Sequence, residues 1–449
     1  MNANSGPSEQ PPSTVTRGPE KQVREAGWFA WFRELGHDGR RAFAGAYGGY
    51  GLDSYDFYVL PLGLAAIGTY FALDNGHTGL LATVTLLVSA VGGALAGMFA
   101  DRVGRVRALV WTVSVYAVFT VACGFAPNFE TLLVFRALQG LGFGGEWAVG
   151  AVLVAEYASA RHRGRTLGWI QSAWAVGWAL AVLVYSVVFH LVDEDLAWRV
   201  LFFTGALPAL LVLYVRRSVK DAPTAARRLK TTDRSHSFAG IFRGRLLRTT
   251  LLAGLMSTGV QGGYYTLATW IPKYLSDERG LAVTGVGGFL VVQIIGAFSG
   301  YVTGAHLADL LGRRRTIGLF AVLSAVCVLC YSRVPADWDG VSLILGFPLG
   351  FCMSAIFSSF GSFLAELYPT EVRGTGQGFT YNTGRAVGAV FPTVVGFLSD
   401  SWGVGGALGF AAIGYLLACV ALLGLPETKG IDLDKVPGAD ALRRSASTE

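Results

Sequence analysis

The sequence GMFADRVGRVR at residues 97–107 returns in altered form 208 residues later, as AHLADLLGRRR at residues 305–315. In both copies an aspartate follows a long apolar run, and a glycine and arginines come after it. A second motif has almost the same offset. Residues 156–163 and residues 366–373, which begin 210 residues apart, each place a glutamate seven residues before an arginine. Two motifs repeated at nearly equal offsets indicate an internal duplication.

Apolar runs long enough to cross a membrane recur on both sides of these motifs. Of the 449 residues 52% are hydrophobic and 15% are charged, against about 25% charged in ordinary soluble domains. A helix needs about 20 residues to cross the hydrocarbon core. We predict twelve spans, at residues 44–67, 78–100, 108–126, 131–155, 166–189, 198–216, 249–271, 282–305, 316–332, 340–365, 376–398 and 404–425. The expected fold is an all-α membrane protein of two pseudo-symmetric six-helix bundles.

A long polar segment between the sixth and seventh spans divides the chain. The predicted parts are a disordered cytoplasmic tail with an interfacial helix (1–43), an N-terminal six-helix bundle (44–216), a cytoplasmic linker (217–248), a C-terminal six-helix bundle (249–425) and a cytoplasmic tail (426–449). Six-span repeats of this kind allow a transporter to expose a central site alternately to the two sides of a membrane.

Lysine and arginine fix the predicted orientation, because they accumulate in cytoplasmic loops. With both termini inside, 30 of the 36 fall on the cytoplasmic side, four fall outside and two lie within spans. We therefore expect a multi-pass protein of the cell (inner) membrane with both termini in the cytoplasm. The net charge of +6 then follows from topology and gives no argument for nucleic-acid binding.

Three motifs resemble those of the major facilitator superfamily, and the resemblance covers residues 40–430. The family's loop signature G-x-x-x-D-R-x-G-R is filled by Gly97, Asp101, Arg102, Gly104 and Arg105. The second copy departs from it, with Ala305 at the place of Gly97. RALQG (136–140) fits the family's fourth-span motif. PETKG (426–430) is similar to the sugar porters and to the organic-acid:proton symporters related to them, which include sialate, aromatic-acid and metabolite carriers.

The repeated charges lie at the cytoplasmic ends of predicted spans, where we expect a gate that closes the inner side. Carboxylates favour helix N-termini and basic groups favour C-termini. The other interpretation is that these charges only set topology. The predicted gate residues are Gly97, Asp101, Arg102, Gly104, Arg105, Glu156, Arg163, Asp309, Gly312, Arg313, Glu366 and Arg373.

Ionisable residues within spans are rare and usually face a cavity or pair with one another. Asp53 and Asp56 in the first span are three residues apart, so they share one helical face. Two carboxylates at close range resist ionising together, so we expect at least one to carry a proton during transport. The alternative is that one of them only pairs with Arg136. Aromatic-acid:proton symporters carry a similar aspartate pair. Glu146, in a glycine-rich stretch, is predicted as a proton relay or as a structural hydrogen-bonding group.

Arg385 lies near the middle of the eleventh span, in FTYNTGRAVGAVFP (379–392). Arginine stays charged and offers a planar fork that matches a carboxylate. With Tyr381 and Asn382 one turn earlier, we predict that Arg385 binds an anionic substrate. This stretch resembles the corresponding region of sialate and short organic-acid symporters. The alternative is a structural ion pair.

Other polar side chains keep a sugar substrate open. Gln171 in the fifth span is spaced like a sugar-binding glutamine of the sugar porters, and the seventh span supplies Gln261 and Tyr264. The fuller glutamine-rich pattern of the sugar porters is incomplete there. Tyr58, Trp174 and Trp178 fit either walls of a substrate site or plain packing.

The sequence thus predicts a secondary transporter that imports a small organic anion with protons. The alternative is a sugar or polyol porter, working by symport or by facilitated diffusion. A drug antiporter is disfavoured because the fifth span lacks proline, and a sensor because no signalling domain is attached. The chain lacks the Walker A, HExxH and GxSxG motifs of enzymes. Expected partners are an organic acid, protons and the lipid bilayer, with a monomeric protein and no cofactor or metal.

Overall fold

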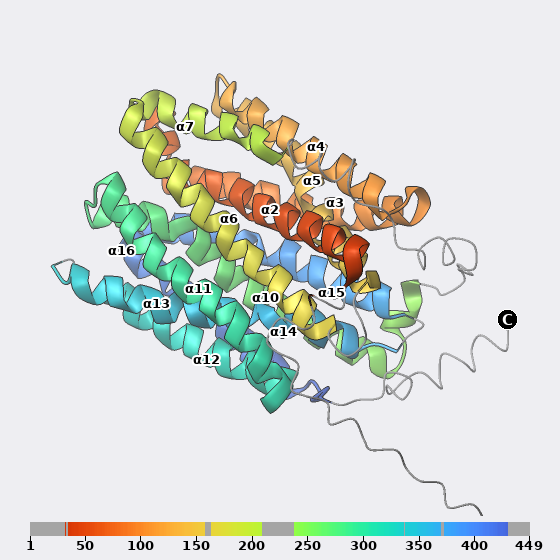
Figure 1. Ribbon diagram of the computed structural model, residues 1–449. Coiled ribbons are helices and arrows are strands. Elements are labelled where there is room, and N and C mark those ends of the chain that lie inside the picture. Colours follow the sequence, from red (N-terminus) through yellow and green to blue (C-terminus); the bar gives the residue numbers. More distant parts are fainter. Residues whose placement is uncertain are drawn as a thin grey trace, which may run out of the picture.

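The protein is described by a computed structural model that covers residue 32 and residues 35–157, 163–208, 238–335, 337–369 and 372–429. The regular elements in these residues are all helical. The helices form two bundles that lie one above the other in the view of Figure 1, with their long axes roughly aligned. Most of the predicted tails and most of the linker lie outside the described residues.

The first bundle contains six helices that follow the first six predicted spans. They are α2 (Gly36–Tyr70), α3 (Asn75–Val103), α4 (Arg105–Gly124), α5 (Phe129–Tyr157), α6 (Arg163–Leu191) and α7 (Glu194–Phe203). The predicted interfacial helix is not separate from the first span. From Gly36 on, α2 runs without a break into the membrane span, because the following residues include no helix-breaking proline before Pro61.

The second bundle repeats this order with more breaks. Its helices are α10 (Arg245–Lys273), α11 (Val283–Leu311), α12 (Arg313–Ser332), α13 (Asp339–Ala355), α14 (Phe357–Glu366), α15 (Arg373–Gly388), α16 (Val390–Leu408) and α17 (Phe410–Leu423). Each of the twelve predicted spans thus coincides at least in part with a described helix. The break before α16 lies close to Pro392, which has no N–H for the Gly388 carbonyl. Gly403, with φ of 71°, separates the last two spans.

The loop motif of the duplication has the same backbone geometry in both bundles. Gly104, between α3 and α4, has φ 97° and ψ 157°. Gly312, between α11 and α12, has φ 101° and ψ 157°. Side chains are strained at such positive φ values, whereas glycine adopts them freely. The motif glycine therefore makes the tight connection between two spans, and the predicted duplication is visible in the structure.

The two bundles meet along two symmetric helix pairs, which follow from the duplication. Helix α6, the fifth span of the first bundle, packs against α11, the second span of the other. Helix α3, the second span of the first bundle, packs against α16, part of the fifth span of the other. Glycines permit close approach there. A Cβ atom on Gly396 would lie 2.4 Å from the Asn75 carbonyl oxygen.

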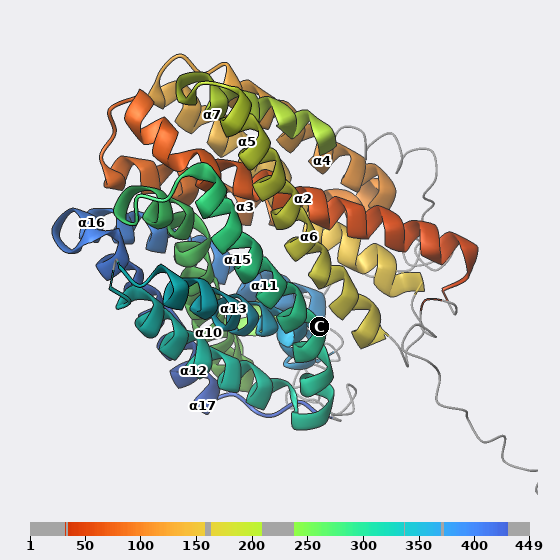
Figure 2. The same cartoon turned by 60° about the vertical axis from the view of Figure 1, so that its left-hand side comes forward.

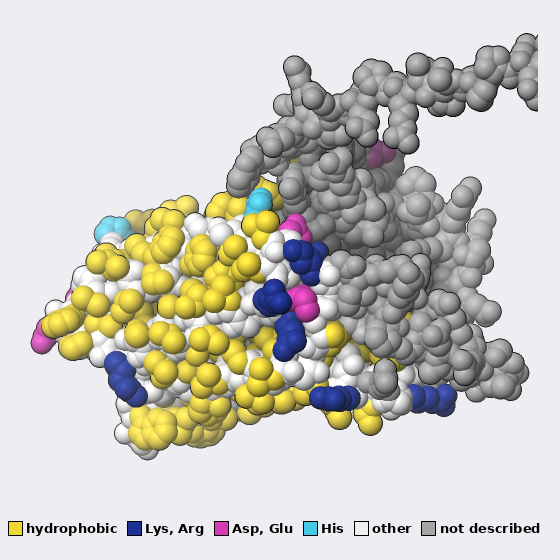
Figure 3. Space-filling view, turned by 90° about the horizontal axis from the view of Figure 1, so that it is seen from below, with side chains coloured by type: hydrophobic (Ala, Val, Ile, Leu, Met, Phe, Trp, Pro, Cys, Tyr) yellow, Lys and Arg dark blue, Asp and Glu magenta, His cyan; other side chains and the backbone are white. Residues whose placement is uncertain are grey.

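The outer surface of the helices suits a lipid environment. Within the described residues, seven helical segments are long and apolar enough to span a membrane by length and composition. Figure 3 shows a broad hydrophobic surface with lysines and arginines towards its edges. Large apolar side chains are exposed on several helices, among them Trp111, Leu183 and Val420. The predicted fold class, a twelve-helix membrane protein of two related bundles, is confirmed.

Candidate functional site

A cavity lies between the two bundles, near the middle of the predicted spans. The space between its lining atoms, counting the part that is open to solvent, is about 410 Å³. Eight of its ten lining residues are aromatic, and the other two are an aspartate and an arginine. The lining consists of Tyr50, Asp53, Phe143, Trp174, Tyr264, Tyr265, Tyr301, Phe357, Tyr381 and Arg385. Four of these residues come from the first bundle and six from the second, so the cavity depends on how the bundles sit against each other.

Arg385 presents a buried guanidinium group to this cavity. Its side chain on α15 is 5% exposed. Its Nη2 donates a hydrogen bond to the Tyr381 hydroxyl, one turn earlier, at 3.2 Å. Its Cζ lies 5.1 Å from the ring centre of Tyr381 and 5.7 Å from that of Phe143. Within the described residues, Nε and Nη1 have no hydrogen-bond partner. The arrangement leaves donors with which this cation can receive an anion.

Asp53 brings the opposite charge to the same cavity from α2. It is 2% exposed, and it lies within range of electrostatic interaction with Arg385. The sequence offered no acid in the second bundle to neutralise Arg385, and the structure places one in the first bundle. A buried charge without a partner is strongly unfavourable. The two charges therefore stabilise each other across the interface between the bundles.

Asp56 lies in a different environment, although it is only three residues from Asp53. It is fully buried within the first bundle, where it accepts hydrogen bonds from the Thr120 hydroxyl and the Gln139 side-chain amide. Arg136 donates to the Oε1 atom of the same glutamine. Gln139 thus connects Asp56 to Arg136. Residues three positions apart on a helix are rotated by about 60°, and Asp56 is not among the residues that line the cavity. Which aspartate carries a proton stays a prediction.

The predicted substrate-binding residues divide into two groups. Tyr381 and Tyr264 line the cavity with Arg385, whereas Gln171, Gln261 and Asn382 are not among the lining residues of the described structure. The amide of Gln261 donates to the Tyr381 carbonyl at 2.9 Å, and that of Asn382 to the Gly378 carbonyl at 2.9 Å.

Gln171 makes its polar contact beside the cavity and across the bundle interface. Its side-chain amide donates to the Phe357 carbonyl at 3.3 Å. The side chain of Glu146, the predicted relay, lies outside the described residues. Its role stays a prediction.

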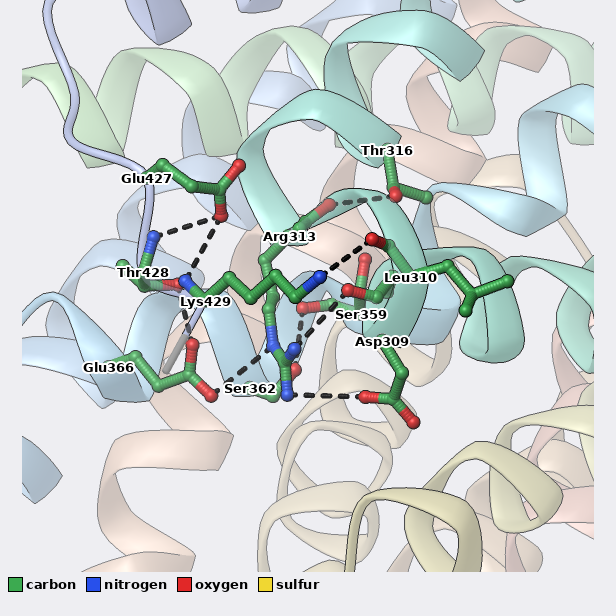
Figure 4. A network of polar contacts seen from close by, with 12 residues as sticks. Asp309, Leu310, Arg313, Thr316, Ser359, Ser362, Glu366, Glu427, Thr428 and Lys429 are labelled. Atoms are coloured by element: carbon green, nitrogen blue, oxygen red, sulfur yellow. Dashed lines mark hydrogen bonds and ion pairs between the residues drawn. The ribbon is translucent and has the colours of Figure 1, made fainter. Parts of the chain in front are cut away.

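Most of the second half of the predicted gate forms one polar network at the C-terminal ends of α11 and α14 and the N-terminal end of α12 (Figure 4). Arg313 lies between Asp309, at 3.3 Å, and Glu366, at 3.4 Å. The Thr428 hydroxyl donates to Glu366 at 2.5 Å, and the Lys429 ammonium donates to the Leu310 carbonyl at 2.7 Å. The PETKG stretch therefore joins the loop motif to the end of α14. Arg373 instead donates to the Tyr368 carbonyl at 3.4 Å.

Glu427 of the same stretch caps the N-terminus of α12. Its carboxylate accepts from the backbone N–H groups of Arg314, at 3.3 Å, and Arg315, at 3.2 Å. Two more backbone donors, from Thr428 and Lys429, bind the same carboxylate. Burial alone raises the pKa of Glu427, but these backbone donors outweigh burial and hold it below its ordinary value. Helix N-termini attract carboxylates for this reason.

The first half of the predicted gate is described only in part. The side chains of Asp101, Arg105, Glu156 and Arg163 lie outside the described residues, and so does the environment of Gly97. Arg102 is exposed at the end of α3, and Gly104 makes the tight connection to α4.

Sequence reasoning missed several aromatic members of the cavity, namely Tyr50, Phe143, Tyr301 and Phe357. One signal was available for Tyr50, which lies three residues before Asp53 on the same helical face. For the others the decisive fact is which helices face each other across the bundles, and helical periodicity does not contain it.

A family model described as the Major Facilitator Superfamily matches residues 46–307 and 300–446. A relative from Cupriavidus pinatubonensis, named as a probable 4-methylmuconolactone transporter, is 38% identical over 414 residues, with 92% of this chain and 96% of the relative covered. The cis,cis-muconate transport protein of Acinetobacter baylyi is 28% identical over 387 residues, covering 84% and 91%. The crystal structure of a D-xylose-proton symporter is similar with a TM-score of 0.70 at 20% identity, covering 88% and 100%.

Proposed function

The chain belongs to the major facilitator superfamily, and we propose that within this family it imports a small organic anion together with protons by alternating access. Membership makes it a membrane transporter and not an enzyme. The fold alone does not name a substrate. The proposal about the cargo therefore rests on the cavity between the bundles and is supported by relatives named for the transport of methylmuconolactone and of muconate.

The observation that carries the proposal is the buried Arg385 with two nitrogen atoms that have no partner among the described residues. A guanidinium pairs with a carboxylate through two parallel hydrogen bonds. Nε or Nη1 can supply one donor of that pair. The second hydrogen of Nη2, or release of Nη2 from the Tyr381 hydroxyl, supplies the other. Bound in this way, the substrate carboxylate supplies the acceptors that the buried cation lacks.

Asp53 is the proposed proton carrier. When the cavity is empty, Asp53 and Arg385 balance each other's charge within electrostatic range. A substrate carboxylate on Arg385 takes over the role of counter-charge, and a second negative charge in the aromatic cavity is then unfavourable. Uptake of one proton by Asp53 restores neutrality, which couples one proton to one substrate carboxylate. In this proposal Asp56 and Arg136 have a structural role: Gln139 bonds to both of them and joins α2 to α5 within the first bundle.

The aromatic lining favours a small substrate with a flat, unsaturated body. Aromatic rings bind such a face through stacked and edge-to-face contacts, and pockets of this kind use few polar groups to fix orientation. Here the polar groups are Arg385, Asp53 and the tyrosine hydroxyls. A highly hydroxylated substrate would need more donors and acceptors than this lining offers.

The proposal extends to the two faces of the membrane. The network of Asp309, Arg313 and Glu366 is proposed to close the cytoplasmic side, together with its counterpart in the first bundle. We propose that both termini lie in the cytoplasm of a cell (inner) membrane protein, and the distribution of lysine and arginine supports this orientation. We propose a monomer, because the two bundles of a single chain form the cavity between them.

Uptake into proteoliposomes under an imposed pH gradient, inside alkaline, tests the proposal. Radiolabelled small aromatic and unsaturated carboxylates are the cargo, with a sugar as comparison. Accumulation above the external concentration that collapses with a protonophore supports proton coupling. Accumulation that an uncoupler leaves unchanged refutes it.

A sugar or polyol porter is the second candidate, favoured by Gln171 and the PETKG stretch. The amide of Gln171 lies at the bundle interface and is bonded to the Phe357 carbonyl, so sugar binding would require that contact to open. This candidate predicts that Arg385→Gln retains transport of a neutral substrate, whereas the anion proposal predicts loss of carboxylate transport in the same variant.

A further inference from the structure

Tyr264 on α10 makes hydrogen bonds to two helices of the opposite bundle. The indole Nε1 of Trp174 on α6 donates to its hydroxyl oxygen at 2.6 Å. The hydroxyl of Tyr58 on α2 lies 3.0 Å from the same oxygen. All three side chains are buried. The Tyr264 ring also packs edge to face against Phe357, with ring centres 5.1 Å apart. One hydroxyl thus ties α10 to both α2 and α6.

The Tyr264 contact lies at the level of the cavity, and a second contact between the bundles lies further out. Tyr58 follows Asp53 by five residues on α2, which is about 7.5 Å along a helix, towards the end that the predicted orientation places outside. Further along the same side, Thr83 of α3 donates to the Ala389 carbonyl at 2.6 Å and lies 2.7 Å from the Thr393 hydroxyl. Ser54, the residue after Asp53, donates to the Trp174 carbonyl at 2.6 Å. The Tyr264 contact therefore lies level with the charged pair and further from the outer ends than the Thr83 contact.

Opening of the cavity to the outside requires the bundles to separate from the Thr83 contact down to the cavity, where Tyr264 lies. That movement breaks both hydrogen bonds of Tyr264. The hydroxyl groups of Tyr264 and Tyr58 and the indole N–H of Trp174 are buried, and leaving buried polar groups without partners costs free energy. Trp174 and Tyr264 also line the cavity. A substrate that occupies the cavity therefore contacts both members of a hydrogen bond between the bundles.

We propose that Tyr264 is a positioning residue that holds the outer side of the cavity closed, and that its release from Trp174 and Tyr58 is a step of outward opening. The inference rests on the proposed transport by alternating access. It assigns to Tyr264 a role in the balance between the closed and the outward-open arrangement of the bundles. The sequence had instead left open a direct contact of Tyr264 with a sugar.

The neighbouring residue offers a matched control. Tyr265 also lines the cavity, but its hydroxyl donates to the Oε1 atom of Gln261 at 3.0 Å, on the same helix. Tyr264→Phe and Tyr265→Phe each remove one hydroxyl and keep the ring. Only the first removes a hydrogen bond between the bundles.

The test measures the distance between the outer ends of the bundles in the full-length protein without substrate or gradient. Spin labels are attached at Glu130→Cys on α5 and Ser401→Cys on α16, both exposed, in a background whose native cysteines are replaced and which still transports. The distance distribution comes from double electron–electron resonance. We expect a several-fold rise of the long-distance population in Tyr264→Phe, and a distribution like that of the parent in Tyr265→Phe.

Trp174→Phe removes the donor of the same hydrogen bond from the opposite bundle and is expected to shift the distances in the same direction. It keeps the test decisive if Tyr264→Phe does not fold. Equal distributions in Tyr264→Phe, Trp174→Phe and Tyr265→Phe would overturn the proposal. Because no substrate is present, this result is independent of whether the uptake assay identifies an organic anion as the cargo.

Discussion

Asp53 of the first bundle and Arg385 of the second line one cavity and lie within electrostatic range of each other across the bundle interface. Each charge, taken by itself, is unfavourable in the middle of a membrane span. Together they bring opposite charges to one cavity from the two bundles. A relative movement of the bundles changes their separation, so the pair is sensitive both to an anion in the cavity and to the conformational state of the transporter.

Arg385→Gln is expected to weaken binding of a carboxylate substrate. Hydrogen bonds to charged groups contribute about 1.5–3 kcal/mol, which corresponds to a loss of affinity of roughly ten- to a hundredfold. Arg385→Lys keeps the charge without the planar fork, so an intermediate loss is expected. Titration calorimetry on the purified protein measures both affinities. Unchanged affinity in Arg385→Gln would remove Arg385 from the substrate site.

Asp53→Asn and Asp56→Asn are expected to separate proton coupling from bundle stability. The amide at position 53 carries no titratable proton, so accumulation driven by a pH gradient is lost while exchange of labelled for unlabelled substrate continues. The amide at position 56 replaces an acceptor of two hydrogen bonds, from Thr120 and Gln139. Loss of such a buried acceptor destabilises by about 1–3 kcal/mol, so a lower melting temperature is expected.

Uptake and counterflow assays in proteoliposomes, with thermal unfolding in detergent, provide the measurements for this pair. The assignment fails if Asp56→Asn abolishes gradient-driven uptake while Asp53→Asn keeps it.

The twelve spans, the duplication and the charges within spans all follow from the sequence, because length, apolar runs and repeated motifs are local properties. The division of labour between Asp53 and Asp56 does not. Two residues that are three positions apart on a helix share a face only approximately. The neighbours that decide the environment of Asp56 are Thr120 and Gln139, and they come from two other helices. The aromatic lining is hidden for the same reason. An aromatic residue at a helical spacing predicts burial, and only the packing of the two bundles decides whether it is buried against protein or against a substrate.

Gly312→Ala is expected to destabilise the polar network around Arg313. Gly312 has φ 101° and ψ 157°, a conformation that is essentially restricted to glycine and costs other residues about 1–3 kcal/mol. A Cβ atom there would also lie 2.5 Å from the carboxyl group of Glu427. A lower melting temperature is therefore expected, with loosening of the PETKG stretch. Gly374→Ala is the matched control, because a Cβ atom at Gly374 meets nothing within 4 Å. Equal melting temperatures of the two variants would contradict this role of the motif glycine.

The carboxyl group of Glu427 is expected to make the stability of the folded protein depend on pH in the acid range. Its pKa lies below the ordinary value of 4.5, because the backbone donors that bind the carboxylate outweigh the effect of burial. A depressed pKa stabilises the folded state at every pH above the unfolded value, and this contribution is lost as the pH falls through the folded pKa. Glu427→Gln removes the charge and retains the shape of the side chain.

We therefore expect the melting temperature of the parent to exceed that of Glu427→Gln by a constant amount from about pH 8 to about pH 5. Below the ordinary value of 4.5 the difference is expected to narrow, because the parent then protonates its own carboxylate in the unfolded chain and loses the advantage of the helix N-terminus. Intrinsic fluorescence during heating at a series of pH values measures the difference. A gap that already closes between about pH 8 and about pH 6 would assign the stabilisation to a group that titrates near neutrality, and not to Glu427.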